Sequence, residues 1–266
     1  MPASRAFTLV VGVLLGSAAC STPATLKPVF LQGRAVATDG DSLFAVTDPA
    51  AATVVLLDRA GRVQATIGAG TLSSPRKVQL DGDAVYVSDV DSNRPLVIEF
   101  GRDGTFRRRI DLDTLARQPH QFAVLPDGAL VVETQDQRLA AVRDDSVTTF
   151  AVIEVGTRPS LLTAAGGGVL HAVPDRWITL YNRFGNIRWR VEWPWDETAF
   201  VSDLAVDHLG RLHVLAGNSV DGTFRTFTLA AESGEVFRWS VPTEQPDFVV
   251  DRFGQVEPAG ERWTNR

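Results

Sequence analysis

The chain has 266 residues and a formal net charge of −6, and 44% of its residues are hydrophobic while 22% are charged. This composition is that of a folded globular protein and excludes global disorder. Because the net negative field repels phosphate backbones, we expect no nucleic acid among the partners.

Residues 1–19 have the pattern of a secretory signal peptide. A positively charged start that ends at Arg5 precedes an apolar run over residues 6–15, which is too short to span a bilayer as a mature helix. Small residues then lead to Cys20, the one cysteine in the chain. The sequence therefore predicts export, with cleavage before Cys20 and no disulfide in the folded domain.

Residues 14–20 resemble the lipobox of bacterial lipoproteins, although Ser17 stands where that family usually has a large aliphatic residue. The resemblance implies that Cys20 is acylated and that residues 20–25 form a short tether. Ser21, rather than Asp, follows the cysteine, which implies an outer-membrane anchor facing the periplasm. The alternative is ordinary secretion, which would leave a free thiol at the mature N-terminus.

Six turn signals recur along residues 26–266, each between two short apolar runs. Their glycines are Gly40, Gly82, Gly128, Gly167, Gly210 and Gly254, at spacings of 39 to 46 residues. A second turn series lies between them, near residues 61, 104, 144, 185 and 234. Two hairpins per repeat give four strands per repeat, and this period is typical of a propeller blade.

The sequence therefore predicts an all-β fold, a six-bladed β-propeller of four-stranded blades. The second turn series has five members, so the last repeat lacks a fourth strand. Residues 26–33 look like the other fourth strands, such as residues 63–68, and are expected to supply the missing strand, which would close the ring and remove an open sheet edge. We expect a monomer.

The second repeat resembles an NHL repeat in residues 74–78, 85–89, 93–94 and 103–106. Parts of the first and third repeats, at residues 46–48 and 119–120, share the pattern, which fades in the later repeats. Six-bladed NHL-like propellers of bacterial lipoprotein type are the nearest resemblance. NHL propellers mostly bind protein or RNA, so this likeness implies a fold more than a function.

The loops that enter the first strand of each blade surround one mouth of the central channel. Aligning the repeats on their turns places a basic group on the early blades and an acidic group on the late blades. We predict a polarised ligand rim here, formed by Arg34, Arg76, Lys77, His120, Gln121, Asp203 and Asp247. The alternative is that these are solvated loop residues or ion pairs between blades.

Trp193 and Trp195 lie in a loop with no counterpart in the other blades, so they are candidate contact aromatics or a cover for the core. Trp189 and Trp239 repeat at one blade position, which favours packing between blades. Residues 107–109 are three arginines on an outer strand, where charge guards against edge pairing.

A non-enzymatic binding or scaffolding module, recognising a protein or a small ligand, fits this pattern best. The alternative is a metal-dependent hydrolase or lyase in the channel. A zinc lyase needs about three converging histidines, and of His120, His171, His208 and His213 only His120 falls on the rim. A calcium-dependent lactonase would find two oxygen ligands in Asp203 and Asp247. We expect no resident cofactor, with calcium as the candidate if there is one.

Overall fold

The computed structural model describes residues 36–38, 43–58, 62–92, 94–118, 120–144, 146–154, 160–174, 176–194, 199–206, 210–240, 248–250, 256–258 and 263–265. All regular secondary structure in these residues is β-strand. No helix in this part of the chain has the length and apolarity to cross a membrane.

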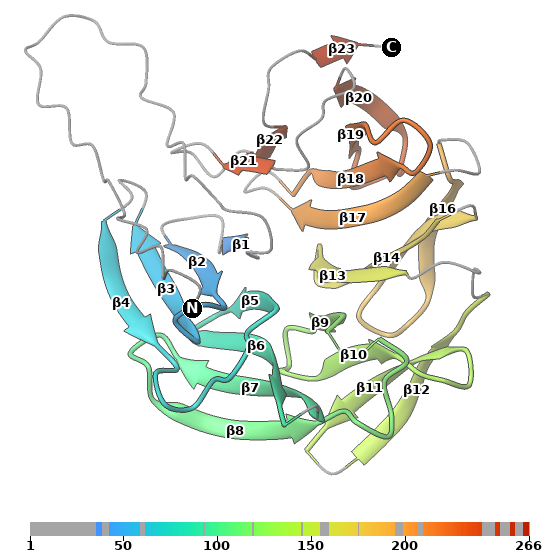
Figure 1. Cartoon of the computed structure of the whole chain (residues 1–266). Coiled ribbons are helices and arrows are strands. Elements are labelled where there is room, and N and C mark those ends of the chain that lie inside the picture. Colours follow the sequence, from blue (N-terminus) through green and yellow to red (C-terminus); the bar gives the residue numbers. More distant parts are fainter. Residues whose placement is uncertain are drawn as a thin grey trace, which may run out of the picture.

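Five sheets, each built on four consecutive antiparallel strands, are arranged around a common centre (Figure 1). Blade one contains β1 (Val36–Thr38), β2 (Leu43–Asp48), β3 (Thr53–Asp58) and β4 (Val63–Ile67), and blade two contains β5 (Lys77–Asp81), β6 (Ala84–Asp91), β7 (Arg94–Gly101) and β8 (Phe106–Asp111). Blade three contains β9 (Phe122–Val124), β10 (Leu130–Glu133), β11 (Arg138–Arg143) and β12 (Ser146–Val152).

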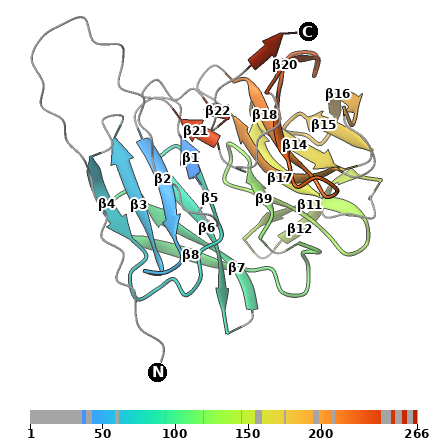
Figure 2. The same ribbon diagram turned by 45° about the horizontal axis from the view of Figure 1, so that its top comes forward.

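Blades four and five continue the same order. Blade four contains β13 (Leu161–Ala165), β14 (Gly168–Val173), β15 (Trp177–Tyr181) and β16 (Ile187–Glu192), and blade five contains β17 (Ala199–Val206), β18 (Leu212–Asn218), β19 (Phe224–Leu229) and β20 (Val236–Ser240). The first strand of each blade is innermost and the fourth is outermost (Figure 1), and Figure 2 shows the order of the four strands in blade one. The predicted all-β propeller of four-stranded blades is confirmed.

The core consists of apolar layers between neighbouring blades. Val85 and Val87 of β6 pack with Ala45 of β2, whereas Tyr86 of the same strand packs with Leu130 of the next blade. Successive residues of a strand point to opposite faces, so a middle strand can fill two layers at once. This explains why the second strands read as continuous apolar runs. Further layers join blades three and four and blades four and five.

The predicted sixth blade is wrong for the residues that the structure describes. The turn signal at residues 251–254 does lie between two paired strands, β21 (Phe248–Val250) and β22 (Val256–Pro258). The next strand, β23 (Trp263–Asn265), leaves this hairpin and pairs with β20 of blade five. The sixth repeat therefore contributes two strands to a sheet of its own and one to its neighbour. The predicted closing strand at residues 26–33 lies outside the described residues.

Candidate ligand-binding site

Lys77 lies at the start of β5, and its side chain crosses the centre of the ring. Its Nζ donates to Gln121 Oε1 at 3.1 Å and to the carbonyl oxygen of Leu162, and it lies 5.7 Å from the centroid of the Phe122 ring. The ammonium therefore joins the innermost strands of blades two, three and four. Two predicted rim residues, Lys77 and Gln121, are in direct contact.

Gln79, two residues further along the same strand, forms the next layer inward. Its Nε2 donates to the Phe122 carbonyl at 3.0 Å and to Thr163 Oγ1 at 3.3 Å, while its Oε1 accepts from Val124 N–H at 3.0 Å. Because Gln79 is buried, its full hydrogen bonding matters for stability. This layer fixes how far apart the strands beneath the rim lie.

Arg76 is exposed on the loop that enters β5. The buried carboxylate of Asp89 accepts hydrogen bonds from Ser73 N–H at 2.9 Å and Ser74 N–H at 2.5 Å, and the Arg76 N–H bonds to the Ser88 carbonyl. The loop is thus tied to β6 on the Asp89 side. Arg76 is presented from a fixed backbone.

His120 lies on the equivalent loop of blade three. Partial burial and the nearby positive charge of Arg76 lower its pKa, against an opposing effect of Asp89. Its Nδ1 is buried and makes no hydrogen bond within the described residues. Near neutral pH the imidazole is therefore uncharged, and the positive charge of the rim comes from the arginine and the lysine.

Glu133 at the end of β10 holds the loop that carries His120. Its carboxylate accepts from Arg117 Nη1 at 2.9 Å and from Ser160 Oγ, and His171 Nε2 lies 3.6 Å from Oε2. Burial by itself would raise the pKa of Glu133, but the nearby His171 ring, the hydrogen bond from Ser160 and the charge of Arg117 outweigh burial and hold the pKa below its usual value.

Glu133 joins two loops, since Arg117 precedes the first strand of blade three and Ser160 the first strand of blade four. Gln118 Nε2 reaches Ser160 Oγ at 3.4 Å and completes the link. Ser160 is the counterpart of Arg76 and His120 in the repeat alignment. Asp89 and Glu133 therefore act alike, each holding a rim loop from a second strand.

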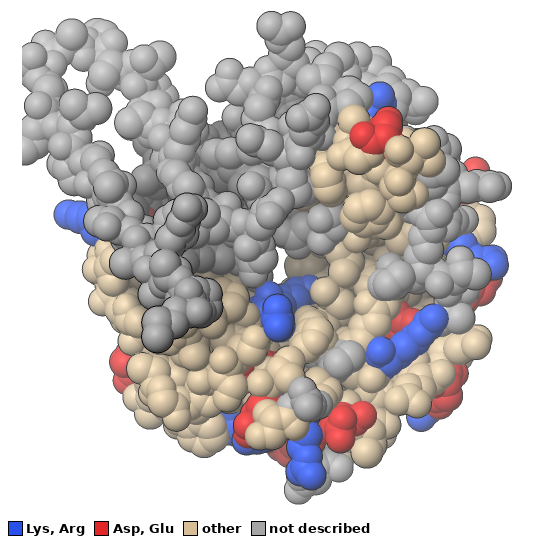
Figure 3. All heavy atoms as spheres, viewed as in Figure 1, with Lys and Arg blue, Asp and Glu red and all other residues tan. Residues whose placement is uncertain are grey.

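The remaining predicted rim residues are not brought into this cluster by the described part of the structure. Arg34 and Asp247 lie outside the described residues. Asp203 lies on β17 next to a register irregularity, and only its backbone is described. The acidic half of the rim stays a prediction, as does the rim as a ligand site. In Figure 3 basic side chains lie close to the centre of the ring on the face in view.

Trp193 is 8% exposed and belongs to the core between blades four and five. Its ring therefore packs inside the protein, which agrees with the core-covering alternative. Trp195 lies outside the described residues, as do Cys20 and the tether. Trp189 also packs between blades, and its Nε1 donates to the Ala231 carbonyl at 2.8 Å.

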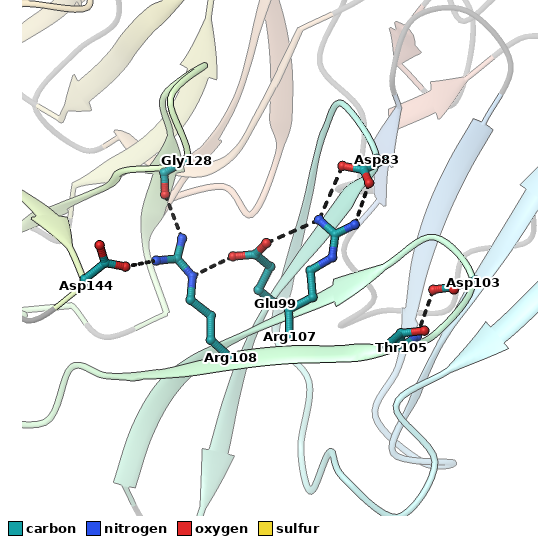
Figure 4. Close-up of polar contacts among 8 residues, drawn as sticks. All are labelled: Asp83, Glu99, Asp103, Thr105, Arg107, Arg108, Gly128 and Asp144. Carbon is teal, nitrogen blue, oxygen red and sulfur yellow. Dashed lines mark hydrogen bonds and ion pairs between the residues drawn. The ribbon is translucent and has the colours of Figure 1, made fainter.

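The three arginines at residues 107–109 lie on β8, an outermost strand, and pair with acids. Arg108 Nε contacts Glu99 Oε2 at 2.6 Å, and its other nitrogens reach the Gly128 carbonyl and Asp144 of blade three (Figure 4). Arg107 pairs with Asp83 at 2.5 Å. This group joins blades two and three.

Two of the histidines weighed as zinc ligands are buried on second strands. His171 faces Glu133, and His213 Nδ1 lies 3.2 Å from Thr228 Oγ1. The described residues contain no group of three or more His, Cys, Asp or Glu side chains placed to hold a metal ion. His208 lies outside the described residues.

Sequence reasoning missed Gln79 and Glu133. Gln79 carried a signal, since a glutamine interrupts an otherwise apolar stretch of an innermost strand. Glu133 likewise ends an apolar run, Leu130–Glu133, at a depth where carboxylates are rare unless paired. Neither sequence pattern indicates which residues form hydrogen bonds with these side chains, because those residues come from other blades.

No protein-family model matches the sequence, and no curated protein matches it. Among solved structures, a protein of unknown function from Bacteroides caccae is similar with a TM-score of 0.55 and 15% identity over 80% of this chain and 84% of that one. A streptogramin B lyase is similar with a TM-score of 0.54 and 13% identity over 85% and 82% of the two chains. A chain of a nidogen/laminin complex has a TM-score of 0.52 and 18% identity over 73% and 74%. These likenesses show the propeller fold.

Proposed function

We propose that this protein is a non-enzymatic binding module that takes an anionic group of a protein or small ligand at the mouth of its central channel. The observation that carries the proposal is the basic pair Arg76 and Lys77 of blade two, beside Gln121 of blade three. Arg76 is exposed on a loop fixed by Asp89, and Lys77 lies beside it in contact with Gln121. A basic mouth in a chain of net charge −6 attracts an anion locally.

The chemistry of the cluster suits a carboxylate or a phosphate. The guanidinium of Arg76 offers a planar pair of donors, which bind such groups bidentately. The amide of Gln121 adds a neutral donor, and uncharged His120 adds a hydrogen-bonding ring nitrogen. Lys77 is already held by neutral oxygens and a ring, so it supplies fixed charge beneath the ligand.

The test compares Arg76→Glu with Arg94→Glu. Arg94 is exposed in the same blade, so both variants change the net charge equally. Tetraglutamate and inorganic phosphate serve as probes, and amide NMR shifts report binding. We expect the probes to shift resonances of residues 74–79 and 118–122 in the wild type and in Arg94→Glu, but not in Arg76→Glu. Equal shifts in all three proteins would refute the rim as an anion site.

We further propose that the module is held at the cell envelope by a lipid on Cys20, on the periplasmic side of the outer membrane. The lipobox resemblance of residues 14–20 supports this. Mass spectrometry of the mature protein from bacterial membranes should find an acylated N-terminal cysteine, and Cys20→Ala should release the protein into the soluble fraction. Ser21→Ala is the control for retained anchoring. A mature N-terminus without acyl groups would contradict the anchor.

The second candidate is a channel-based hydrolase or lyase that uses calcium or another divalent cation. What favours it is that a streptogramin B lyase has the same fold, and Asp203 belongs to an innermost strand. Metal analysis of purified protein distinguishes the two. Stoichiometric calcium or zinc that survives dialysis would favour the enzyme, and Asp203→Asn should then abolish it.

A further inference from the structure

The first half of β12, the outermost strand of blade three, is exposed, whereas Phe150 and Ala151 near its end pack against the core. Its first four residues, Ser146 to Thr149, are all exposed, and Val147 retains 49% of its accessible surface. The strand runs for seven residues and contains no charged residue, proline or glycine. A long uncharged edge of this kind is a template for pairing with another strand.

The other outermost strands are protected. β8 carries Arg107, Arg108 and Arg109, which pair with acids. β16 carries Arg188, Arg190 and Glu192, and β20 is covered by β23. β4 is uncharged but has five residues against the seven of β12, and it ends in the buried Ile67. Of the five outermost strands described, β12 alone combines length, exposure and lack of charge.

The ladder determines which backbone groups are offered to a partner. Arg143 and Ser146 pair across a two-residue turn, which makes them a hydrogen-bonded pair. Hydrogen-bonded and non-hydrogen-bonded pairs alternate in an antiparallel ladder. Val147 and Thr149, opposite Val142 and Ala140, therefore direct their N–H and C=O groups away from the blade. These two residues form the docking edge.

Charges at the two ends of β12 determine the kind of partner. Asp144 precedes the strand and lies 3.1 Å from Arg108, and Glu154 follows the strand and lies 3.9 Å from Arg190. Their side chains are still 80% and 60% exposed, so each carboxylate keeps surface that a partner can reach. Two copies of β12 paired about Thr149 would place Asp144 opposite Glu154 twice, and like charges directly opposite are destabilising. A second copy of this chain is thus a poor occupant, whereas basic residues at both ends of a partner strand would meet an acid.

We propose that β12 is a strand-addition site for an extended protein segment with an uncharged, β-branched centre and Lys or Arg at both ends. Main-chain hydrogen bonds to Val147 and Thr149 would supply affinity, and the acids at the ends would supply selectivity. The chain itself contains one added strand, since β23 pairs with β20. The site is separate from the rim.

The test uses a labelled synthetic peptide of alternating Thr and Val with Lys at both ends, cut to the length of residues 144–154, and fluorescence anisotropy with the whole protein. Val147→Pro removes an outward N–H without breaking the ladder to β11. We expect it to weaken binding at least about tenfold, the loss of roughly one hydrogen bond. Val147→Thr keeps the N–H and is expected to bind like the wild type.

Two changes to the peptide leave the protein untouched, so the test holds even if Val147→Pro misfolds. Methylation of every central peptide nitrogen, which removes the donors of both edges, should abolish binding, and Glu in place of the terminal Lys residues should weaken it. Binding that survives nitrogen methylation would overturn strand addition. Sedimentation of the protein alone tests whether a second copy of the chain occupies the site. If the wild type is a dimer and Val147→Pro is a monomer, a second copy pairs with β12 and the proposed partner is wrong.

Discussion

Two buried carboxylates, Asp89 and Glu133, determine where the rim of this propeller lies. Each lies on the second strand of its blade, and each accepts hydrogen bonds from the loop entering the first strand. Burying a carboxylate is costly unless its oxygens are satisfied by donors. The donors that satisfy these oxygens also fix the loops that carry Arg76 and His120.

Glu133→Gln is expected to destabilise the fold by about 2 kcal/mol, because it removes charge-assisted hydrogen bonds at a buried site. The pKa of Glu133 is lowered in the folded state, so its contribution is present above the unfolded value of 4.5 and is lost as the pH falls through the folded pKa. Urea unfolding at pH 7 and pH 3 measures both effects. The difference between wild type and variant should shrink at pH 3, and a constant difference would contradict the assignment.

His120→Gln is expected to reduce the loss of folding stability that occurs as the pH falls below neutral. The pKa of His120 is lowered in the folded state by burial and by Arg76, from an ordinary value of 6.5. The unfolded chain therefore takes up a proton first, so stability is full above pH 6.5 and is lost as the pH falls towards the folded pKa. Thermal melts from pH 7.5 to pH 5 should show a smaller drop in the variant. An identical drop would mean that other groups account for the acid sensitivity.

At the scale of elements, the turns between third and fourth strands join each blade to the one before it. Gly104 packs on Ile67, Gly185 on the Phe150 carbonyl and Gly234 on the Trp189 ring. These glycines belong to the second turn series of the sequence. Their spacing reveals hairpins, but their contact with the preceding blade depends on how neighbouring sheets sit together.

Gly185→Ala should destabilise the protein by about 3 kcal/mol. Its φ of +81° disfavours a side chain, and an added Cβ would overlap the Phe150 carbonyl oxygen, which is backbone and cannot move aside cheaply. Gly222→Ala is the matched control, since its φ is +71° but the space around it is open. It should cost about 1 kcal/mol. Equal losses of unfolding free energy in the two variants, measured by chemical denaturation, would show that the contact between blades does not contribute to stability.

Arg108→Gln should cost about 1–2 kcal/mol, because Arg108 joins Glu99 of its own blade to Gly128 and Asp144 of the next. Arg109→Gln on the same strand removes one exposed ion pair, with Asp91, and should cost less than about 0.5 kcal/mol. Denaturant midpoints of the two variants measure this contrast. Similar midpoints would place Arg108 among ordinary surface charges.

At the scale of the whole molecule, the turn residues correctly predicted the division of the chain into four-stranded blades. Turn glycines at 82 and 128 have positive φ and lie where the spacing placed them. The predicted number of blades was wrong because it depends on where β23 pairs. β23 has three residues of mixed polarity, and so short a strand carries no sequence signal for the strand that it pairs with. Lys77 and Gln121, both taken from the repeat alignment as rim residues, are in direct contact, while the rim as a ligand site stays a prediction. Gln79 and Glu133 were missed because their partners lie on other blades, far away in the sequence.

The hairpin of β21 and β22 lies between blade five and blade one in both views of the ring (Figures 1 and 2). Four apolar layers join blades one to five in series. A series of blades has two ends, and each unclosed end leaves sheet surface open to other chains. The hairpin therefore stands where the two ends of the series approach each other.

Deletion of residues 241–266 should lower the melting temperature and promote self-association, because it removes this hairpin together with the β23 cover of β20. Deletion of residues 262–266 alone removes only β23, so it separates the two contributions. We expect association in both variants, from the exposed β20 edge, but a large fall in melting temperature only in the longer deletion. Thermal melts and sedimentation measure these outcomes. If the longer deletion melts like the wild type, the five blades are stable without the hairpin between their ends.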